Sequence, residues 1–184
     1  MTEQAIPWQV LGVRRLHKDA WREVVTERVR LHGGQERTYT YVKTPPAVWV
    51  VPVTADFQIV LLRQYRHPVR DWCWEVPAGT IGAEGARASA ARELSEEVGG
   101  TFAELLEIGA FYSSSAHLTL KAQVFLATGV TLGPTRHEET ELIEIVRLPA
   151  EEAFARARGG AINEGQSALA ILLAEPHIRR RMGD

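Results

Sequence analysis

The chain has 184 residues, of which 45% are hydrophobic and 24% are charged. These fractions are typical of an ordinary globular protein, and the length suits one domain with a modest appendage. The formal net charge of −2 provides no basic excess for binding phosphate backbones or anionic membrane surfaces. We therefore expect neither nucleic acid nor a membrane as a partner.

The sequence also indicates where in the cell the protein is expected to be. We expect no signal peptide and no membrane span, because no apolar run is long enough to cross a bilayer. The single cysteine, Cys73, excludes an intrachain disulfide and a cysteine-rich metal site, so we expect a reducing, cytoplasmic location. Trp72 and Trp74 flank Cys73, and we interpret it as a packed hydrophobic residue rather than a nucleophile.

The first forty-odd residues predict a three-stranded antiparallel sheet. Residues 8–16, 21–31 and 36–42 each tend toward period-two alternation, and His32-Gly33-Gly34 is a hairpin turn. Thr44-Pro45-Pro46 interrupts the pattern, so we expect an N-terminal unit at 1–44 and a main domain at 45–184. So small a sheet is hardly stable alone and should pack on another surface.

The rest of the chain predicts a mixed α/β domain. A continuous apolar run at 47–53 is typical of a buried strand, and a second strand follows at 58–63. A short strand at 74–76 leads through a loop into a helix rich in carboxylates. Three more strands are expected at about 105–113, 118–126 and 143–148, and two helices at 150–158 and 167–173. This order predicts an α/β sandwich with a mixed sheet.

Three carboxylates in the expected helix share one face. Glu93, Glu96 and Glu97 are spaced i, i+3 and i+4, a spacing at which like charges repel one another. A divalent cation relieves that repulsion, because Mg²⁺ prefers carboxylate oxygen and bridges to substrate phosphates. The alternative is a solvated face with an ordinary ion pair between Arg92 and Glu96.

The residues from 77 to 100 read PAGTIGAEGARASAARELSEEVGG. This segment resembles the Nudix box, whose pattern is GX5EX7REUXEEXGU, with U a bulky aliphatic residue. Every position from Glu84 to Gly99 fits, and so many fixed identities in a short span favour the resemblance over the solvated face. Two positions depart: four residues rather than five separate Gly79 from Glu84, and Gly100 stands where an aliphatic residue is usual.

The resemblance implies a Nudix fold and the Mg²⁺-dependent hydrolysis of a nucleoside diphosphate linked to another moiety, with Mn²⁺ an alternative ion. It implies that Glu93 and Glu97 are the principal metal ligands and that Glu96 bridges ions or binds a second one at the reacting centre. The backbone carbonyl of Ala78 is a further candidate ligand. The resemblance gives Glu84 and Arg92 structural or outer-shell roles, with Arg92 anchoring the loop through Glu84.

Outside the box, the chain resembles the ADP-ribose pyrophosphatase branch of the family. The N-terminal sheet, the segment Gln64-Tyr65-Arg66 and the residues 74–79 carry this likeness. It implies a homodimer with swapped elements, Arg66 on the diphosphate or terminal ribose, and Glu75 on polar groups of the substrate. A surface ion pair remains the alternative for Arg66. Trp21 or Tyr41 is a candidate to stack on adenine, although aromatic residues in strands are more often core.

A second acidic group, at residues 137–141, precedes the last strand. Relatives in this branch place a catalytic carboxylate on a mobile loop here. The likeness makes Glu139 the candidate general base and Glu141 a ligand or water-orienting partner, whereas the alternative is a solvated acidic loop.

The sequence leaves the substrate open. ADP-ribose hydrolases commonly have a proline in the segment after the box, but Tyr112-Ser113-Ser114-Ser115-Ala116 has none. ADP-ribose is the first candidate and another nucleotide sugar such as GDP-mannose the second. A Nudix-fold sensor that binds such a nucleotide without cleaving it has no need of several metal carboxylates. A nucleoside triphosphatase has no need of the N-terminal sheet.

Overall fold

The structure is a computed structural model that describes residues 7–135 and 142–183. The chain forms two compact units. The N-terminal unit runs up to Pro46 and also contains the segment Tyr112–Lys121, and the main unit contains Ala47–Phe111 and the chain from Ala122 onward. Each unit is described separately.

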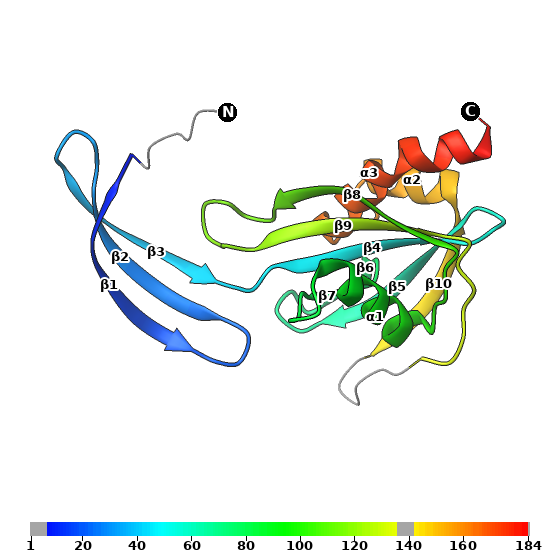
Figure 1. Ribbon diagram of the computed structural model, residues 1–184, viewed down its shortest axis with the longest axis horizontal. Helices are drawn as coiled ribbons and strands as arrows, with labels where there is room; N and C mark the ends of the chain where they lie inside the picture. Colours follow the sequence, from blue (N-terminus) through cyan, green and yellow to red (C-terminus); the bar gives the residue numbers. More distant parts are fainter. Residues whose placement is uncertain (1–6, 136–141, 184) are drawn as a thin grey trace. The chain divides into compact units, whose positions relative to one another are not determined.

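The N-terminal unit contains the predicted antiparallel sheet. Strands β1 (Gln9–Lys18), β2 (Glu23–Arg30) and β3 (Glu36–Lys43) pair in the order β1-β2-β3 (Figure 1). The turn between β1 and β2 is closed by Asp19, whose Oδ1 accepts the N–H groups of Trp21 and Arg22 at 2.7 and 2.8 Å. Val25 and Val29 are buried, but β1 is exposed along nearly its whole length.

The segment Tyr112–Lys121 also belongs to this unit, which the sequence did not reveal. Val42 of β3 accepts a hydrogen bond from Thr119 and donates one to the carbonyl of His117, at 3.1 and 2.8 Å. The N–H groups of His117 and Leu118 donate to the carbonyl of Ser114 and close a turn. The strand expected at 118–126 therefore begins only at Lys121.

The main unit is built on a mixed sheet in the order β10-β5-β4-β9-β8, with β6 added beside β5 and β7 beside β4. Its strands are β4 (Ala47–Val53), β5 (Gln58–Arg66), β6 (Asp71–Glu75), β7 (Ala78–Thr80), β8 (Glu104–Tyr112), β9 (Lys121–Thr128) and β10 (Ile143–Pro149). Strand β4 is parallel to β9 and buried at every position, as its continuous apolar run predicts. The predicted α/β fold is confirmed.

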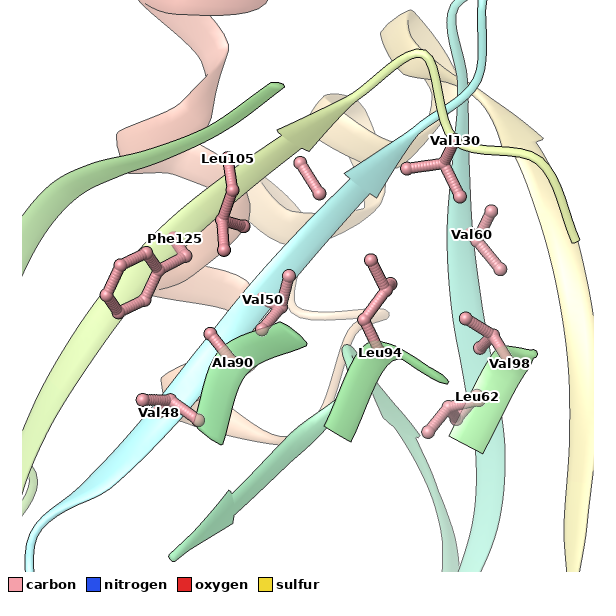
Figure 2. Packing of buried hydrophobic residues seen from close by; sticks show 11 residues of the cluster. Val48, Val50, Val60, Leu62, Ala90, Leu94, Val98, Leu105, Phe125 and Val130 are labelled. Carbon is pink, nitrogen blue, oxygen red and sulfur yellow. The ribbon is translucent and has the colours of Figure 1, made fainter. Parts of the chain in front are cut away.

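Helices pack on this sheet. Helix α1 (Ala86–Val98) buries the face that carries Ala90, Leu94 and Val98, and these side chains meet β-strand residues such as Val50 and Leu62 (Figure 2). Helices α2 (Ala150–Arg158) and α3 (Gly165–Met182) pack against each other, and α3 also packs on β4. Over residues 7–135 and 142–183, no helix has the length and apolar character needed to span a membrane.

Two sequence expectations about these elements are wrong. Helix α3 was expected at 167–173 but continues through Pro176 to Met182. Proline removes one helical hydrogen bond, yet Ala174 and Ile178 on either side of it are buried, and this packing sustains the helix. The stretch Ala78–Thr80 was expected as a loop, but it forms strand β7 by pairing with the start of β4.

Replacing Leu94 tests the packing of α1 on the sheet. Leu94 is fully buried in the core between helix and sheet, so Leu94→Ala should lower the free energy of unfolding by roughly 3 kcal/mol. Urea denaturation followed by tryptophan fluorescence measures this loss. The matched control is Leu169→Ala, which shortens an exposed leucine of α3 and should change stability by less than about 0.5 kcal/mol. Equal losses in both variants would contradict this core.

Candidate active site

The ends of helix α1 are set by two glycines. The helix begins after Gly85, whose φ is 87°, and ends at Gly99, whose φ is 62° and whose N–H donates to the carbonyl of Leu94. A Cβ atom at Gly99 would lie 2.2 Å from the carbonyl oxygen of Gly133. A left-handed conformation and this close approach both require glycine at the end of the helix.

Arg92 lies among the carboxylates of this helix and of the loop before it. Its guanidinium contacts Glu93 at 2.8 Å, Glu96 at 3.0 Å and Glu84 at 3.3 Å. It also donates to the backbone carbonyl of Thr80 at 3.2 Å. The expected contact between Arg92 and Glu84 is therefore present. One guanidinium reduces the repulsion among three carboxylates and ties the helix to strand β7.

Gly79 of β7 leaves room for the carboxylate of Glu93. A Cβ atom built on Gly79 would lie 1.9 Å from Oε1 of Glu93 and 2.6 Å from Oε2. Glu93 itself is buried, although it carries a charge. The glycine at this position therefore determines where that carboxylate can lie relative to the strand.

The shortened loop before α1 is closed by a buried hydroxyl. Ser89 accepts the N–H of Gly82 at 3.0 Å and donates to Oε1 of Glu84 at 2.8 Å. A Cβ atom at Gly82 would lie 2.1 Å from the carboxylate of Glu84. The pKa of Glu84 is lowered by its own backbone N–H, then by Ser89 and Arg92. Glu84 therefore stays ionised and helps to hold the loop.

Glu97 joins the helix to strand β7 at a second point. Its Oε2 accepts the backbone N–H of Ala78 at 3.1 Å, and Ala78 is paired with Trp49 of β4. The side chain of Glu97 is thus held beside Ala78, whose backbone carbonyl is a candidate metal ligand by the family resemblance. Ala78, Glu93, Glu96 and Glu97 lie on two neighbouring elements, α1 and β7.

Arg66 and Glu75 form a bidentate ion pair across β5 and β6. The Nε and Nη2 atoms of Arg66 donate to the two carboxylate oxygens of Glu75 at 2.7 and 2.5 Å. Glu75 is 4% exposed, whereas the Arg66 side chain is 45% exposed. The hydrogen bonds that Arg66 donates to Glu75 raise the pKa of Arg66, and the charges of Glu97 and Glu164 add to the shift. Two residues separate Glu75 from Ala78, whose N–H donates to Glu97, so one short segment joins the ion pair to the carboxylate helix.

The NUDIX domain model matches residues 43–168, which is more than half of the chain. The chain belongs to the Nudix family. It is a Nudix hydrolase, and the match spans the box and the strands that flank it.

Individual relatives agree with this assignment. The chain is 32% identical over 152 residues to an ADP-ribose pyrophosphatase of Bacillus subtilis (strain 168), covering 81% of this chain and 82% of that protein. It is 31% identical over 162 residues to an ADP-ribose pyrophosphatase of Mycobacterium tuberculosis (strain ATCC 25618 / H37Rv), covering 84% and 77%. A crystal structure of an ADP compounds hydrolase aligns with a TM-score of 0.84 at 20% identity over 98% of both chains, which shows a shared fold.

Nudix hydrolases generally use divalent metal ions, and the donor set of α1 fits such an ion by its chemistry. Glu93, Glu96 and Glu97 supply hard carboxylate oxygens from one helical face. Across residues 7–135 and 142–183, no three His, Cys, Asp or Glu side chains already converge as a metal cage. Instead, Glu93 and Glu96 contact Arg92, and Glu97 contacts Ala78. Binding an ion would exchange some of these contacts for metal–oxygen bonds.

Three other residues named from the sequence lie outside helix α1 and strand β7. Trp21 is in the N-terminal unit, at the turn between β1 and β2, and is 66% exposed. Tyr41, on β3, donates from its hydroxyl to Glu27 at 2.9 Å. Cys73 is buried, and burial raises the pKa of its thiol, which agrees with a packed side chain. Glu139 and Glu141 lie outside the described residues.

Sequence reasoning missed two serines. Ser89 and Ser167 are fully buried, and each hydroxyl joins a backbone N–H to a carboxylate. Ser89 fixes the loop before α1, and Ser167 contacts the segment between β6 and β7. The signal available in the sequence was a serine among small apolar residues near the start of a helix, where an exposed position is more usual.

Replacing Gly79 tests whether it sets the position of Glu93. Gly79→Ala places a methyl group where the carboxylate of Glu93 lies, so that side chain must move. We expect turnover to fall on the order of 100-fold, because a displacement of about 1 Å in a catalytic group has an effect of that size. Steady-state hydrolysis measures this, and circular dichroism checks the fold. Gly12→Ala is the control, since nothing lies within 4 Å of a Cβ at that position. Full activity of Gly79→Ala would contradict the assignment.

Proposed function

We propose that this Nudix hydrolase cleaves the pyrophosphate bond of a nucleoside diphosphate sugar, with ADP-ribose, giving AMP and ribose 5-phosphate, as the preferred substrate. The observation that carries the proposal is that one short segment, Glu75–Ala78, joins the ion pair between Arg66 and Glu75 to the carboxylate face of α1, since Ala78 donates its N–H to Glu97. Two relatives more than 30% identical carry the name ADP-ribose pyrophosphatase, which supports the choice of substrate.

Arg66 is the proposed contact for the substrate's diphosphate or terminal ribose. Glu75 engages two of the five N–H donors of the guanidinium and holds its plane in one orientation. The remaining donors match phosphate oxygens in geometry and charge. Glu75 is buried beneath this contact, so its proposed role is to orient Arg66 as well as to accept from a ribose hydroxyl.

Glu93 and Glu97 are the proposed principal ligands of Mg²⁺, with Mn²⁺ an alternative that suits the same oxygens. Glu96 and the carbonyl of Ala78 complete the proposed donor set. When bound, the ion neutralises the diphosphate and lowers the pKa of a bound water. Glu139 as general base and Glu141 as a ligand or water-orienting residue stay predictions from the family resemblance.

We further propose that the protein works in the cytoplasm as a homodimer. Four large apolar side chains of the N-terminal unit are exposed, namely Val10, Val13 and Leu16 on β1 and Trp21 in the turn after it, and they support a second copy as partner. Large exposed apolar patches are typical of interaction surfaces. A second copy is also the setting in which Trp21 or Tyr41 would stack on adenine.

Sedimentation equilibrium tests the proposed dimer. The wild-type chain should sediment at twice the monomer mass of 20.5 kDa. The double variant Val13→Glu and Leu16→Lys adds charge to the exposed strand and should shift the equilibrium to monomer by at least about tenfold. The matched control is Glu107→Lys on β8, where an exposed charge is reversed outside the N-terminal unit. A wild-type monomer at micromolar concentration would refute the proposal.

A substrate panel tests the proposed function. The purified protein is incubated with Mg²⁺ and ADP-ribose, GDP-mannose, NADH, FAD or nucleoside triphosphates, and the products are separated. AMP and ribose 5-phosphate from ADP-ribose are expected. Faster cleavage of GDP-mannose would support the same pyrophosphate hydrolysis with GDP-mannose, the second candidate, as the preferred substrate. The segment Ser113–Ala116, which lacks the proline common in ADP-ribose hydrolases, is the reason for including it. Tight binding without cleavage of any compound would overturn the proposed reaction.

The variant Glu97→Gln tests the ligand assignment in the same assay. Glutamine keeps a side-chain oxygen for the N–H of Ala78, so the fold should survive, but it lacks the negative charge. Turnover should fall by more than about 100-fold, which exceeds the usual effect of outer-shell changes. Glu107→Gln removes an exposed charge from β8 and is the control, with unchanged turnover expected. Normal turnover by Glu97→Gln would rule out Glu97 as a ligand.

A further inference from the structure

The four residues from Glu75 to Ala78 connect the two parts of the proposed site. Glu75, the last residue of β6, holds Arg66, and Ala78, the first residue of β7, donates its N–H to Glu97. The distance between the ion pair and the carboxylate helix therefore depends on the path of this short segment. Pro77 lies in its middle, and its carbonyl accepts the N–H of Val50 at 2.8 Å.

The backbone N–H of Val76, in the same segment, is hydrogen-bonded to a residue far away in the sequence. The N–H of Val76 donates to the hydroxyl of Ser167, at 3.1 Å and 91 residues further on. Ser167 is completely buried, and Val76 is also buried. Because water has no access there, loss of the hydroxyl would leave a buried N–H without a partner, which is costly enough to move the backbone.

The hydroxyl of Ser167 is oriented by Glu164. Ser167 donates its O–H to Oε2 of Glu164 at 2.6 Å, so that its lone pairs remain for Val76. The same carboxylate accepts the N–H groups of Gln166 and Ser167 and caps helix α3. The cap of α3 and the support of the β6–β7 segment thus share one carboxylate.

Asn163, one residue before this cap, holds the outer edge of β6. Its amide nitrogen donates to the carbonyl of Trp72 at 3.1 Å, and its amide oxygen accepts the N–H of Trp74 at 2.9 Å. The side-chain amide therefore makes the pair of hydrogen bonds that a neighbouring strand would make. Strand β6 is fixed between β5 on one side and Asn163 on the other.

We propose that Ser167, oriented by Glu164 and assisted by Asn163, is a positioning residue that sets the segment Glu75–Ala78 and so aligns Arg66 with the carboxylates of α1. Neither Ser167 nor Asn163 contacts substrate in this scheme. The proposal rests on the proposed function for its kinetic readout alone, because the hydrogen bonds of Val76 and Trp74 can be followed without any substrate.

Amide hydrogen exchange and steady-state kinetics on Ser167→Ala test the proposal. Exchange at Val76 and Ala78 should accelerate at least about tenfold, since both amides lose their fixed geometry. In conditions where the variant is fully folded, kcat/KM should fall roughly tenfold, as for other outer-shell partners. We expect KM and kcat to change together, because the segment supports both Arg66 and Glu97.

Ile178→Val is the matched control. It shortens a buried side chain of the same helix, α3, and lowers stability without touching the Glu75–Ala78 segment. Its exchange at Val76 and its kcat/KM should equal those of the wild type. Asn163→Ala is the second variant and removes an exposed side chain, so it should fold even where Ser167→Ala does not. It should raise exchange at Trp74 and increase KM.

Two results would overturn the proposal. The first is normal exchange at Val76 and normal kinetics in both Ser167→Ala and Asn163→Ala. The second is a loss of stability alone, with exchange raised evenly along α3 and unchanged kcat/KM, which would reduce Ser167 to a helix cap. If the wild-type protein cleaves no compound of the panel, the proposed function fails, and the exchange rates at Val76 and Trp74 alone then decide whether Ser167 and Asn163 position the segment.

Discussion

Repulsion among the carboxylates of helix α1 is the constraint on which the rest of the main unit depends. Glu93, Glu96 and Glu97 share one face, and Glu93 is buried. A buried carboxylate is costly unless hydrogen bonds and opposite charge compensate it. Arg92 supplies that charge to Glu93 and Glu96, and the backbone N–H of Ala78 supplies a hydrogen bond to Glu97. The opposite face, buried on the sheet, keeps the helix folded against this repulsion.

The backbone around the helix is shaped by the same carboxylates. Gly79 and Gly82 lie where any Cβ atom would overlap Glu93 or Glu84. A Cβ atom at Gly100 would lie 2.9 Å from Cγ of Leu94, so an aliphatic residue at this position of the box would require Leu94 to shift. The departure from the family pattern thus accompanies close packing of Leu94 against Gly100.

Elements of the fold that depend on local sequence patterns could be predicted from the sequence, whereas those that depend on contacts between distant residues could not. The box, the hairpin sheet and the buried strand β4 follow from local periodicity and from residue identities within a short span. The course of α3 through Pro176 depends on tertiary burial, and the membership of residues 112–121 in the N-terminal unit depends on hydrogen bonds to β3. The contacts of Ser167 with Val76 and of Asn163 with β6 join positions about 90 residues apart, which single-sequence patterns do not encode.

Charge balance gives an independent reason to expect a cation in this enzyme. The guanidinium of Arg66 is matched by Glu75, and that of Arg92 contacts three carboxylates. The charge of Glu97 acts on the same region. The two arginines are therefore outnumbered, and an anionic diphosphate approaching them would meet a net negative field. Arg66 and Arg92 are therefore better suited to orienting the groups that they contact than to attracting the substrate from solution. Divalent ions held by the carboxylates of α1, as proposed above, would supply the positive charge that attracts the substrate.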